Sequence, residues 1–158
     1  MNLKRLSNKE LRELSKEVSQ YGFVLRKGNE VYSALVENRK VIVLNKRIGF
    51  FYFKERILPS LHILLENQNI LNSMKKIIID RGAIAHIINR ADVMRPGILS
   101  YSPDLNKDEI AVVVEEQNMK PIAFTQSLFK SEEISALKSG VVAKNIHCYG
   151  DSIWNFKI

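Results

Sequence analysis

Leucine and valine residues recur at helical spacing through the first twenty residues, with Lys and Glu between them. This pattern is typical of an amphipathic helix. Ser7 and Glu10 form an S-x-x-E capping box, in which the hydroxyl accepts a hydrogen bond from the backbone N–H three residues on. The sequence therefore predicts a helix that begins after Ser7 and ends at Tyr21-Gly22. Its apolar positions are Leu3, Leu6, Leu11, Leu14 and Val18.

Short runs of β-branched and aromatic residues follow, separated by turn residues, and they predict a small antiparallel sheet. The expected strands are Phe23–Arg26, Val31–Glu37, Lys40–Asn45 and Gly49–Lys54. Pro59 is expected to start a second helix that ends at Asn67–Asn69. Because the next residues are rich in Asn and poor in large apolar side chains, we place a domain boundary near Asn72. The expected domains are residues 1–73 and 74–158.

The second half alternates short apolar strands with few helices. Lys75–Asp80 predicts a strand, Ala83–Asn89 a helix of barely two turns, and Arg90–Gly97 a loop. Further strands are expected at Ile98–Ser102, Glu109–Glu115, Pro121–Thr125, Val141–Cys148 and Ser152–Lys157, with a short helix at Ser131–Leu137. Many short strands with few helices indicate a small closed or partly closed barrel, so the predicted fold class is α+β.

Charge is unevenly distributed along the 158 residues, whose formal net charge is +7. Residues 1–73 hold 13 Lys and Arg against 7 Asp and Glu, a net charge of +6. Residues 74–158 hold 11 against 10, a net charge of +1. A basic excess of this kind favours a polyanionic partner, because each neutralised phosphate releases a counterion. It is also common in small proteins that bind no nucleic acid.

Composition narrows the protein class further. Hydrophobic residues make up 46% and charged residues 26%, which is ordinary for a folded globular chain. The single cysteine, Cys148, excludes an internal disulfide and a multi-cysteine zinc site. No apolar run is long enough for a membrane span, and no apolar segment follows the charged N-terminus as in a signal peptide. We therefore expect a cytoplasmic protein with no membrane partner.

Residues 77–98, which read IIIDRGAIAHIINRADVMRPGI, resemble the opening of a PUA domain, a module of pseudouridine synthases and archaeosine transglycosylases. That family's pattern is an apolar strand, Asp-x-Gly-Ala, a short helix, a Gly-Ala loop and Pro-Gly before the next strand. The segments 108–114, 121–123 and 146–154 fit as well. One departure is Arg90, which stands where many PUA loops carry Gly. Others are Lys107 and the pair Phe124-Thr125, at positions that often hold Gly.

Two further segments extend the resemblance to the malignant T-cell-amplified sequence protein family and its archaeal relatives. Gly49–Leu61 is similar to the segment preceding the PUA domain in these relatives, and Ala91–Ile98 is the distinctive phrase ADVMRPGI. The resemblance implies a pre-PUA module with a small antiparallel sheet and helices, followed by a PUA β-pseudo-barrel. It also implies binding to RNA, with no catalysis and no cofactor.

By the same resemblance, RNA lies against the short helix, the loop after it and the last strand near His147–Gly150. The implied RNA-binding residues are Arg81, Gly82, Ala83, His86, Arg90, Met94, Arg95, Gly97, His147 and Tyr149. Gly and Ala at a strand-to-helix turn leave backbone N–H groups open to an anion, and arginines can fork around a phosphate. The same turn is equally suited to close packing, and surface arginines are often only solvated.

Other candidate chemistry is weak. Asp80 fits a helix cap or an ion pair better than an acid catalyst. His86 and His147 can stack on a base but are more often structural, and they lack metal-ligand spacing. Adjacent His147 and Cys148 point to opposite faces of a strand and do not predict a nucleophilic pair. No P-loop, G-x-S-x-G or dinucleotide-binding motif occurs.

These observations predict a non-catalytic protein that binds structured RNA. By resemblance, that RNA is tRNA or small-subunit rRNA in translation initiation or recycling, and a factor related to density-regulated protein is a candidate protein partner. Two alternatives remain open at this point. One is a protein-interaction adaptor, and the other is an accessory subunit that presents tRNA to a separate RNA-modification enzyme.

Overall fold

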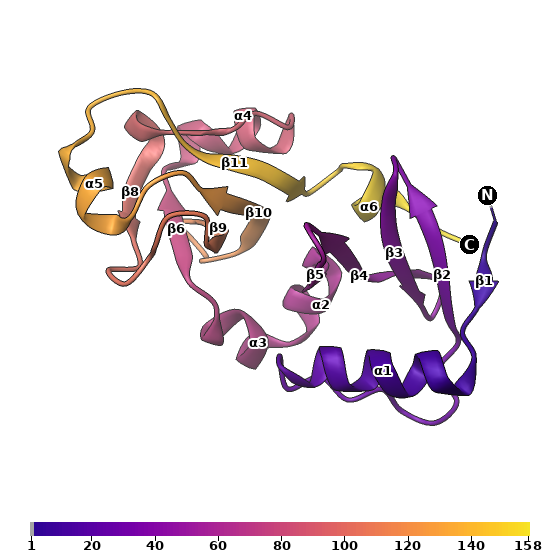
Figure 1. Cartoon of the computed structure of the whole chain (residues 1–158). Coiled ribbons are helices and arrows are strands. Elements are labelled where there is room, and N and C mark those ends of the chain that lie inside the picture. Colours follow the sequence, from indigo (N-terminus) through magenta and orange to yellow (C-terminus); the bar gives the residue numbers. More distant parts are fainter. Residues whose placement is uncertain (1) are drawn as a thin grey trace. The chain divides into compact units, whose positions relative to one another are not determined.

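The computed structural model describes residues 2–158 and divides the chain into two compact units. The first unit contains the residues up to Glu66 together with Ser152–Ile158, and the second contains Asn67–Asp151. Figure 1 follows the chain through both units. The division differs from the expected domains in two places: the segment 67–73 lies in the second unit, and the C-terminal residues return to the first.

The first unit is an antiparallel sheet with helices. Its strands are β1 (Lys4–Arg5), β2 (Val31–Val36), β3 (Arg39–Leu44), β4 (Arg47–Phe53) and β5 (Arg56–Pro59), and they pair in sequence order. Its helices are α1 (Asn8–Ser19), α2 (Leu61–Glu66) and α6 (Ser152–Asn155). The helix predicted after Ser7 is confirmed, because the Glu10 N–H donates to Ser7 Oγ at 3.2 Å. The predicted α+β sheet-and-helix organisation is likewise confirmed.

Two details of this sheet differ from the prediction. Phe23–Arg26 is not a strand; Phe23 packs edge-on against the buried Phe50, with ring centroids 5.1 Å apart. Pro59 ends the unpredicted strand β5 and does not begin a helix. The β4–β5 hairpin was missed because its two-residue turn, Lys54-Glu55, has positive φ angles of 48° and 65° without the Gly or Asn that usually marks such a turn.

The second unit is a nearly closed, barrel-like sheet whose strand order is β7-β11-β10-β9-β6-β8. Strands β6 and β9 pair in parallel, and every other pair in this sheet is antiparallel. The predicted barrel is confirmed. Its strands are β6 (Lys76–Ile79), β7 (Val93–Met94), β8 (Ile98–Tyr101), β9 (Ile110–Glu115), β10 (Pro121–Ser127) and β11 (Val141–Cys148).

Short helices complete the second unit. These are α3 (Gln68–Ser73), α4 (Ile84–Ile88), α5 (Ser131–Ala136) and the 3₁₀ turns η1 (Arg81–Ala83) and η2 (Arg95–Gly97). Helix α3 spans the position near Asn72 where we expected a domain boundary, and its Ile70 and Leu71 are buried. A two-residue apolar contact is too short a signal to separate such a helix from a linker by periodicity.

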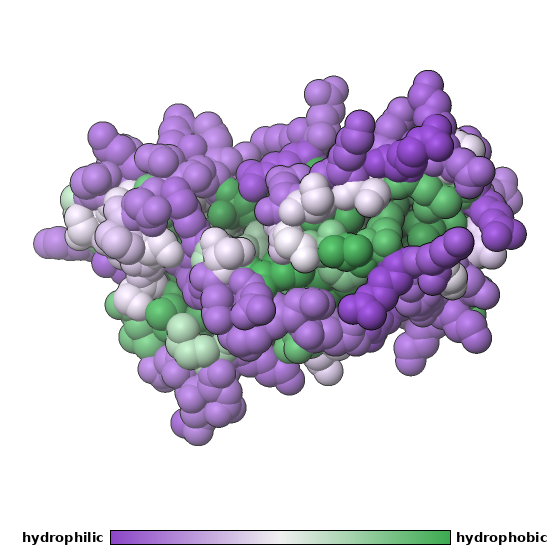
Figure 2. All heavy atoms as spheres, turned by 90° about the horizontal axis from the view of Figure 1, so that it is seen from below, coloured by the Kyte–Doolittle hydropathy of each residue, from purple (hydrophilic) through white to green (hydrophobic). Residues whose placement is uncertain are grey.

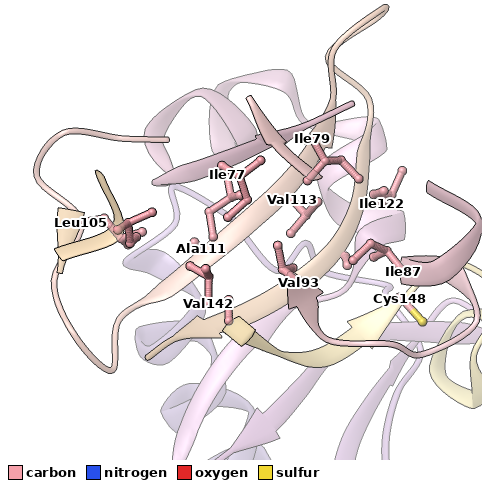
Figure 3. Packing of buried hydrophobic residues seen from close by; sticks show 14 residues of the cluster. Ile77, Ile79, Ile87, Val93, Leu105, Ala111, Val113, Ile122, Val142 and Cys148 are labelled. Atoms are coloured by element: carbon pink, nitrogen blue, oxygen red, sulfur yellow. The ribbon is translucent and has the colours of Figure 1, made fainter. Parts of the chain in front are cut away.

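Aliphatic side chains from nearly every strand fill the barrel (Figure 3). Ile77 and Ile79 of β6 and Val113 of β9 are fully buried, and Ile87 of α4 packs in the same cluster. In Figure 3 the labelled side chains point toward one another between the strands. Because Ile87 belongs to this core, helix α4 is held on the barrel, and its other side chains take fixed positions on the surface.

The C-terminal segment was predicted to be a strand at 152–157 but forms helix α6 in the first unit. The Trp154 ring stacks on His62 of α2 with centroids 3.9 Å apart, and its carbonyl oxygen lies 3.0 Å from His62 Nε2. The Ile158 N–H donates to the carbonyl of Lys46 at 3.1 Å. These contacts join positions far apart in sequence, which a local pattern cannot anticipate.

Hydrophilic residues cover most of the face drawn in Figure 2, with hydrophobic residues reaching the surface between them. Val24 and Leu35 are the most exposed large hydrophobic residues of the first unit, at 71% and 68%. Among residues 2–158, no helix combines the length and the apolarity needed to span a bilayer.

Candidate nucleic-acid interface

A groove of about 510 Å³ lies on the second unit, between the η1–α4 segment and residues 91–97. We call it the second-unit groove. Half of the residues that the sequence singled out line it: Gly82, Ala83, His86, Met94 and Gly97. Its floor includes the buried Ile79, Ile87 and Val93, so the interior is largely apolar. Asp80 and Asp92 are the acidic residues in its lining.

One end of the groove is built by the turn that precedes α4. Asp80 caps this turn, since its Oδ1 accepts from the Ala83 N–H at 3.1 Å. The capping interpretation of Asp80 is therefore confirmed. The same bond changes the expectation for Gly82-Ala83, because the Ala83 N–H already faces a carboxylate. A phosphate at this N–H would meet the negative charge of Asp80, so the turn is better suited to a neutral group.

The two walls of the groove touch at Gly97. The Asp80 N–H donates to the Gly97 carbonyl at 3.0 Å. A Cβ atom at position 97 would lie only 2.9 Å from the Ala83 Cβ, closer than real side chains approach. Glycine at 97 thus lets the segment before β8 pack directly on the η1 turn, which explains the Pro-Gly pair in the sequence.

Arg90 ends helix α4 in the left-handed conformation, with φ of +71°. Its N–H donates to the Ile87 carbonyl at 3.0 Å, and the Ala91 N–H donates to the His86 carbonyl at 3.0 Å. These two bonds form a Schellman motif with Arg90 at the position that usually holds glycine. The departure from the family pattern therefore leaves the backbone turn in place and adds a charged side chain to it.

Exposed side chains lie in the groove lining or next to it in the sequence. His86 on α4 lines the groove and is exposed, and the exposed Arg81 and Arg90 adjoin lining residues. Met94 is 47% exposed, and Tyr149, which follows β11, is 44% exposed. Cationic, imidazole and thioether groups can contact phosphates and stack on bases, whereas Tyr149 lies outside the groove lining.

Arg95 has a different environment from the other two arginines. Its Nε donates to the carbonyls of Ile134 and Leu137 at 2.9 and 3.1 Å, at the C-terminal end of α5. A cation at a helix C-terminus is favourable, and here it bonds the Leu137 carbonyl and shares the Ile134 carbonyl with the Leu137 N–H. Asp92, three residues before Arg95, pairs with Lys144 at 3.2 Å. The Arg95 side chain therefore supports the barrel.

His147 is also a structural residue in this environment. It is 1% exposed, its Nδ1 lies 2.8 Å from Asp151 Oδ2, and its ring stacks on Phe124. The neighbouring Cys148 is equally buried, and burial together with the Asp151 charge raises the pKa of its thiol. A thiol with a raised pKa is a poor nucleophile at neutral pH, in line with the rejected Cys–His pair.

Lys144 belongs to the surface beside the groove, and the sequence interpretation missed it. It is exposed on β11, which pairs with β7 of the groove wall. The signal was available, because strand alternation places Lys144 opposite in direction to the buried Ala143. Within residues 2–158, no group of three or more His, Cys, Asp or Glu is placed to hold a metal ion.

A mixed-direction barrel of six strands with a capped turn and a short helix at its rim is the architecture of a PUA domain. The family model described as "PUA domain" matches residues 75–149, inside the second unit. Comparison with curated proteins reaches further along the chain. An uncharacterized protein of Methanocaldococcus jannaschii is 32% identical over 96% of this chain and 94% of its own length.

Translation machinery-associated protein 20 of Eremothecium gossypii is 31% identical, over 75% of this chain and 67% of its own length. Malignant T-cell-amplified sequence 1 of Rattus norvegicus is 25% identical, over 82% and 68%. The chain belongs to the family that contains these two proteins and their archaeal PUA-domain relatives. The resemblance seen in the sequence is confirmed.

Solved structures agree with this assignment. A conserved PUA domain protein from Thermoplasma acidophilum superposes with a TM-score of 0.77 and 25% identity, over 98% of this chain and 99% of that one. A hypothetical protein from Pyrococcus horikoshii superposes with a TM-score of 0.74 and 27% identity, over 97% and 98%. Both likenesses include the first unit as well as the barrel.

Proposed function

We propose that this protein binds structured RNA through the second-unit groove and takes part in translation without catalysing a reaction. The observation that carries the proposal is a largely apolar groove whose lining residues Gly82 and Ala91 directly follow the exposed Arg81 and Arg90 in the sequence. Arginine on a rim binds backbone phosphate, while an apolar interior with imidazole and thioether groups accepts an unstacked base. The RNA we propose is tRNA or small-subunit rRNA, engaged during initiation or recycling.

Family membership supports the translation role, because the relative in Eremothecium gossypii carries the name Translation machinery-associated protein 20. The strong basic excess of residues 1–73 favours an RNA partner over a purely protein one. A factor related to density-regulated protein is the protein partner we propose for the same step.

The test is binding of an unmodified tRNA transcript to the full chain at several salt concentrations. The groove variant Arg81→Ala/Arg90→Ala removes two exposed cations that adjoin lining residues in the sequence. The control Lys107→Ala/Lys138→Ala removes two exposed cations of the second unit that adjoin no lining residue in the sequence. We expect the groove variant to weaken binding and to lower the slope of log affinity against log salt by roughly 0.7–0.9 per lost contact.

The control is expected to leave most of the affinity and the slope intact. Binding that is absent at low salt in the unsubstituted protein contradicts the RNA assignment and favours the adaptor alternative. Equal weakening by the groove variant and the control moves the RNA away from the groove. Turnover of the tRNA by the purified protein, abolished by a substitution in this chain, contradicts the non-catalytic role.

A further inference from the structure

A second recess lies on the first unit, and it is lined by several cationic side chains, unlike the largely apolar second-unit groove. It has a volume of about 500 Å³ and lies between β1, the N-terminal half of α1, the start of β2 and the segment 25–30. We call it the first-unit pocket. Its size is within the range of about 300–1,000 Å³ that is usual for ligand sites. Four cationic side chains line it, against the single acidic residue Glu30: Arg5, Arg12, Arg26 and Lys27.

These four cations have no acidic partners. Within residues 2–158, none of the salt bridges involves them, although Lys4, Arg47 and Lys144 are each paired with a carboxylate. All four are exposed around the recess. Like charges held near one another without counter-charges raise the local positive potential, and an anion that neutralises them releases counterions.

The wall that carries Arg26 and Lys27 is held by local hydrogen bonds. The Arg26 N–H donates to Asn29 Oδ1 at 2.8 Å, and the Asn29 N–H returns to the Arg26 carbonyl at 3.1 Å. Gly28 supplies the positive φ, +97°, that this tight turn needs. The turn is fixed at its base as well, because the Asn45 N–H donates to the Glu30 carbonyl at 3.1 Å.

The opposite wall is fixed by regular structure. Arg5 lies on β1 and is paired with Tyr32 of β2, and Arg12 lies on α1, a helix held by the buried Leu14 and Val18. Strand β1 leads directly into α1, and β2 lies beside β1 (Figure 1). Leu6, Leu11 and Leu25 add apolar surface to the recess. Apolar surroundings strengthen charge–charge attraction compared with open water.

We propose that the first-unit pocket binds phosphodiester groups of an RNA backbone, as a second RNA contact separate from the second-unit groove. Three of its four cations are arginines, whose planar forks match phosphate oxygens two at a time. The net charge of the lining, four cations against one carboxylate, suits several phosphates in succession better than one small anion. This inference rests on the proposed function, since it assigns a further part of the same RNA.

The experiment uses the full chain and the same unmodified tRNA transcript. The pocket variant Arg12→Ala/Arg26→Ala is compared with Lys9→Ala/Lys157→Ala, which removes the same charge from exposed positions of the first unit outside the pocket lining. We expect the pocket variant to lose roughly 25- to 60-fold in affinity at 0.1 M salt, the effect of two lost phosphate contacts. The control is expected to change affinity far less.

A measurement on the unsubstituted protein accompanies the variants. Amide hydrogen exchange of residues 25–32 is expected to slow when tRNA is added. Two results would overturn the pocket as an RNA contact and leave the proposed function standing. One is exchange that stays unchanged on addition of tRNA. The other is a pocket variant that binds tRNA like its control while Arg81→Ala/Arg90→Ala weakens binding. If the unsubstituted protein binds no tRNA, the proposed function itself fails.

Competition with small anions distinguishes a site for the RNA backbone from a site for a small soluble ligand. Uridine monophosphate and inorganic phosphate are added as competitors against the tRNA. We expect both to compete only at concentrations far above those at which tRNA saturates the protein. Competition by uridine monophosphate at concentrations similar to those of the tRNA would show a mononucleotide site and overturn the backbone assignment.

Discussion

The second-unit groove and the first-unit pocket differ in how the arginines near them are held. In the second-unit groove the interior is apolar, and Arg95 in the adjoining segment is held by carbonyls of α5. In the first-unit pocket the arginines are exposed, and no carboxylate among residues 2–158 forms a salt bridge with them. The comparison shows that an arginine in the phrase that resembles the family, Ala91–Ile98, can be a structural residue, while arginines outside any recognised motif form the more positive surface.

The largest loss of stability is expected when Arg95, the arginine with a structural role, is removed. Arg95→Ala removes charged donors from the carbonyls of Ile134 and Leu137, and we expect a loss of about 2–3 kcal/mol in the free energy of unfolding. Arg26→Ala in the first-unit pocket is expected to cost less than about 0.5 kcal/mol. Urea denaturation of both variants checks the difference, and similar losses would contradict it.

A second substitution tests how the groove walls are held. Gly97→Ala brings a Cβ to within 2.9 Å of the Ala83 Cβ, and we expect a cost of about 2 kcal/mol from overpacking. Gly28→Ala in the pocket turn meets no atom within 4 Å but must adopt a positive φ, at about 1 kcal/mol. Gly28→Asn is expected to regain part of that loss, since Asn tolerates this conformation, whereas Gly97→Asn is not.

Acid should weaken the second unit through Glu115, which is 8% exposed. Its carboxylate accepts from the backbone N–H groups of Gln117, Asn118 and Lys120 at 2.7, 2.8 and 3.0 Å. Burial acts to raise the pKa of Glu115, but these hydrogen bonds and the Lys120 charge outweigh it, and the pKa is lowered.

Because the folded-state pKa lies below the unfolded value of about 4.3, ionised Glu115 stabilises the fold above that pH. The contribution is lost as the pH falls through the folded-state pKa. Glu115→Gln should cost about 1–1.5 kcal/mol at pH 7 and flatten the dependence of the melting temperature on pH below 4.3. Glu13→Gln, on the exposed face of α1, is the control. An unchanged acid profile in Glu115→Gln would refute this origin.

The smallest effect is a gain. Arg90→Gly places the favoured residue at a φ of +71°, and we expect the free energy of unfolding to rise by about 0.5–1 kcal/mol while RNA affinity falls. Thermal denaturation and tRNA binding of one variant measure both quantities. A loss of stability would mean that the contacts of the Arg90 side chain outweigh the backbone strain.

The sequence predicted the elements whose signals are local. The Ser7 cap, the alternating strands of the first sheet and the Ile triplet of β6 each follow from spacing within a few residues. The resemblance named five of the residues that line the second-unit groove, Gly82 and Met94 among them, as RNA contacts, and that role stays a prediction.

What could not be predicted depends on long-range contacts. Nothing near Arg95 indicates that its partners are carbonyls about 40 positions later, and nothing near His147 indicates the stack on Phe124. The first-unit pocket was visible only as an excess of charge, because its four cations come from three segments that the fold brings together.

Helix α6 has a consequence for the order in which the chain folds during synthesis. Residues 67–151 form the second unit from one continuous stretch, whereas the first unit needs the last residues to place Trp154 on His62. Contacts between positions this far apart, 92 for His62 and Trp154, form slowly, because a long loop must close before they form. The second unit can therefore finish folding during synthesis before residues 152–158, which the first unit needs, have been made.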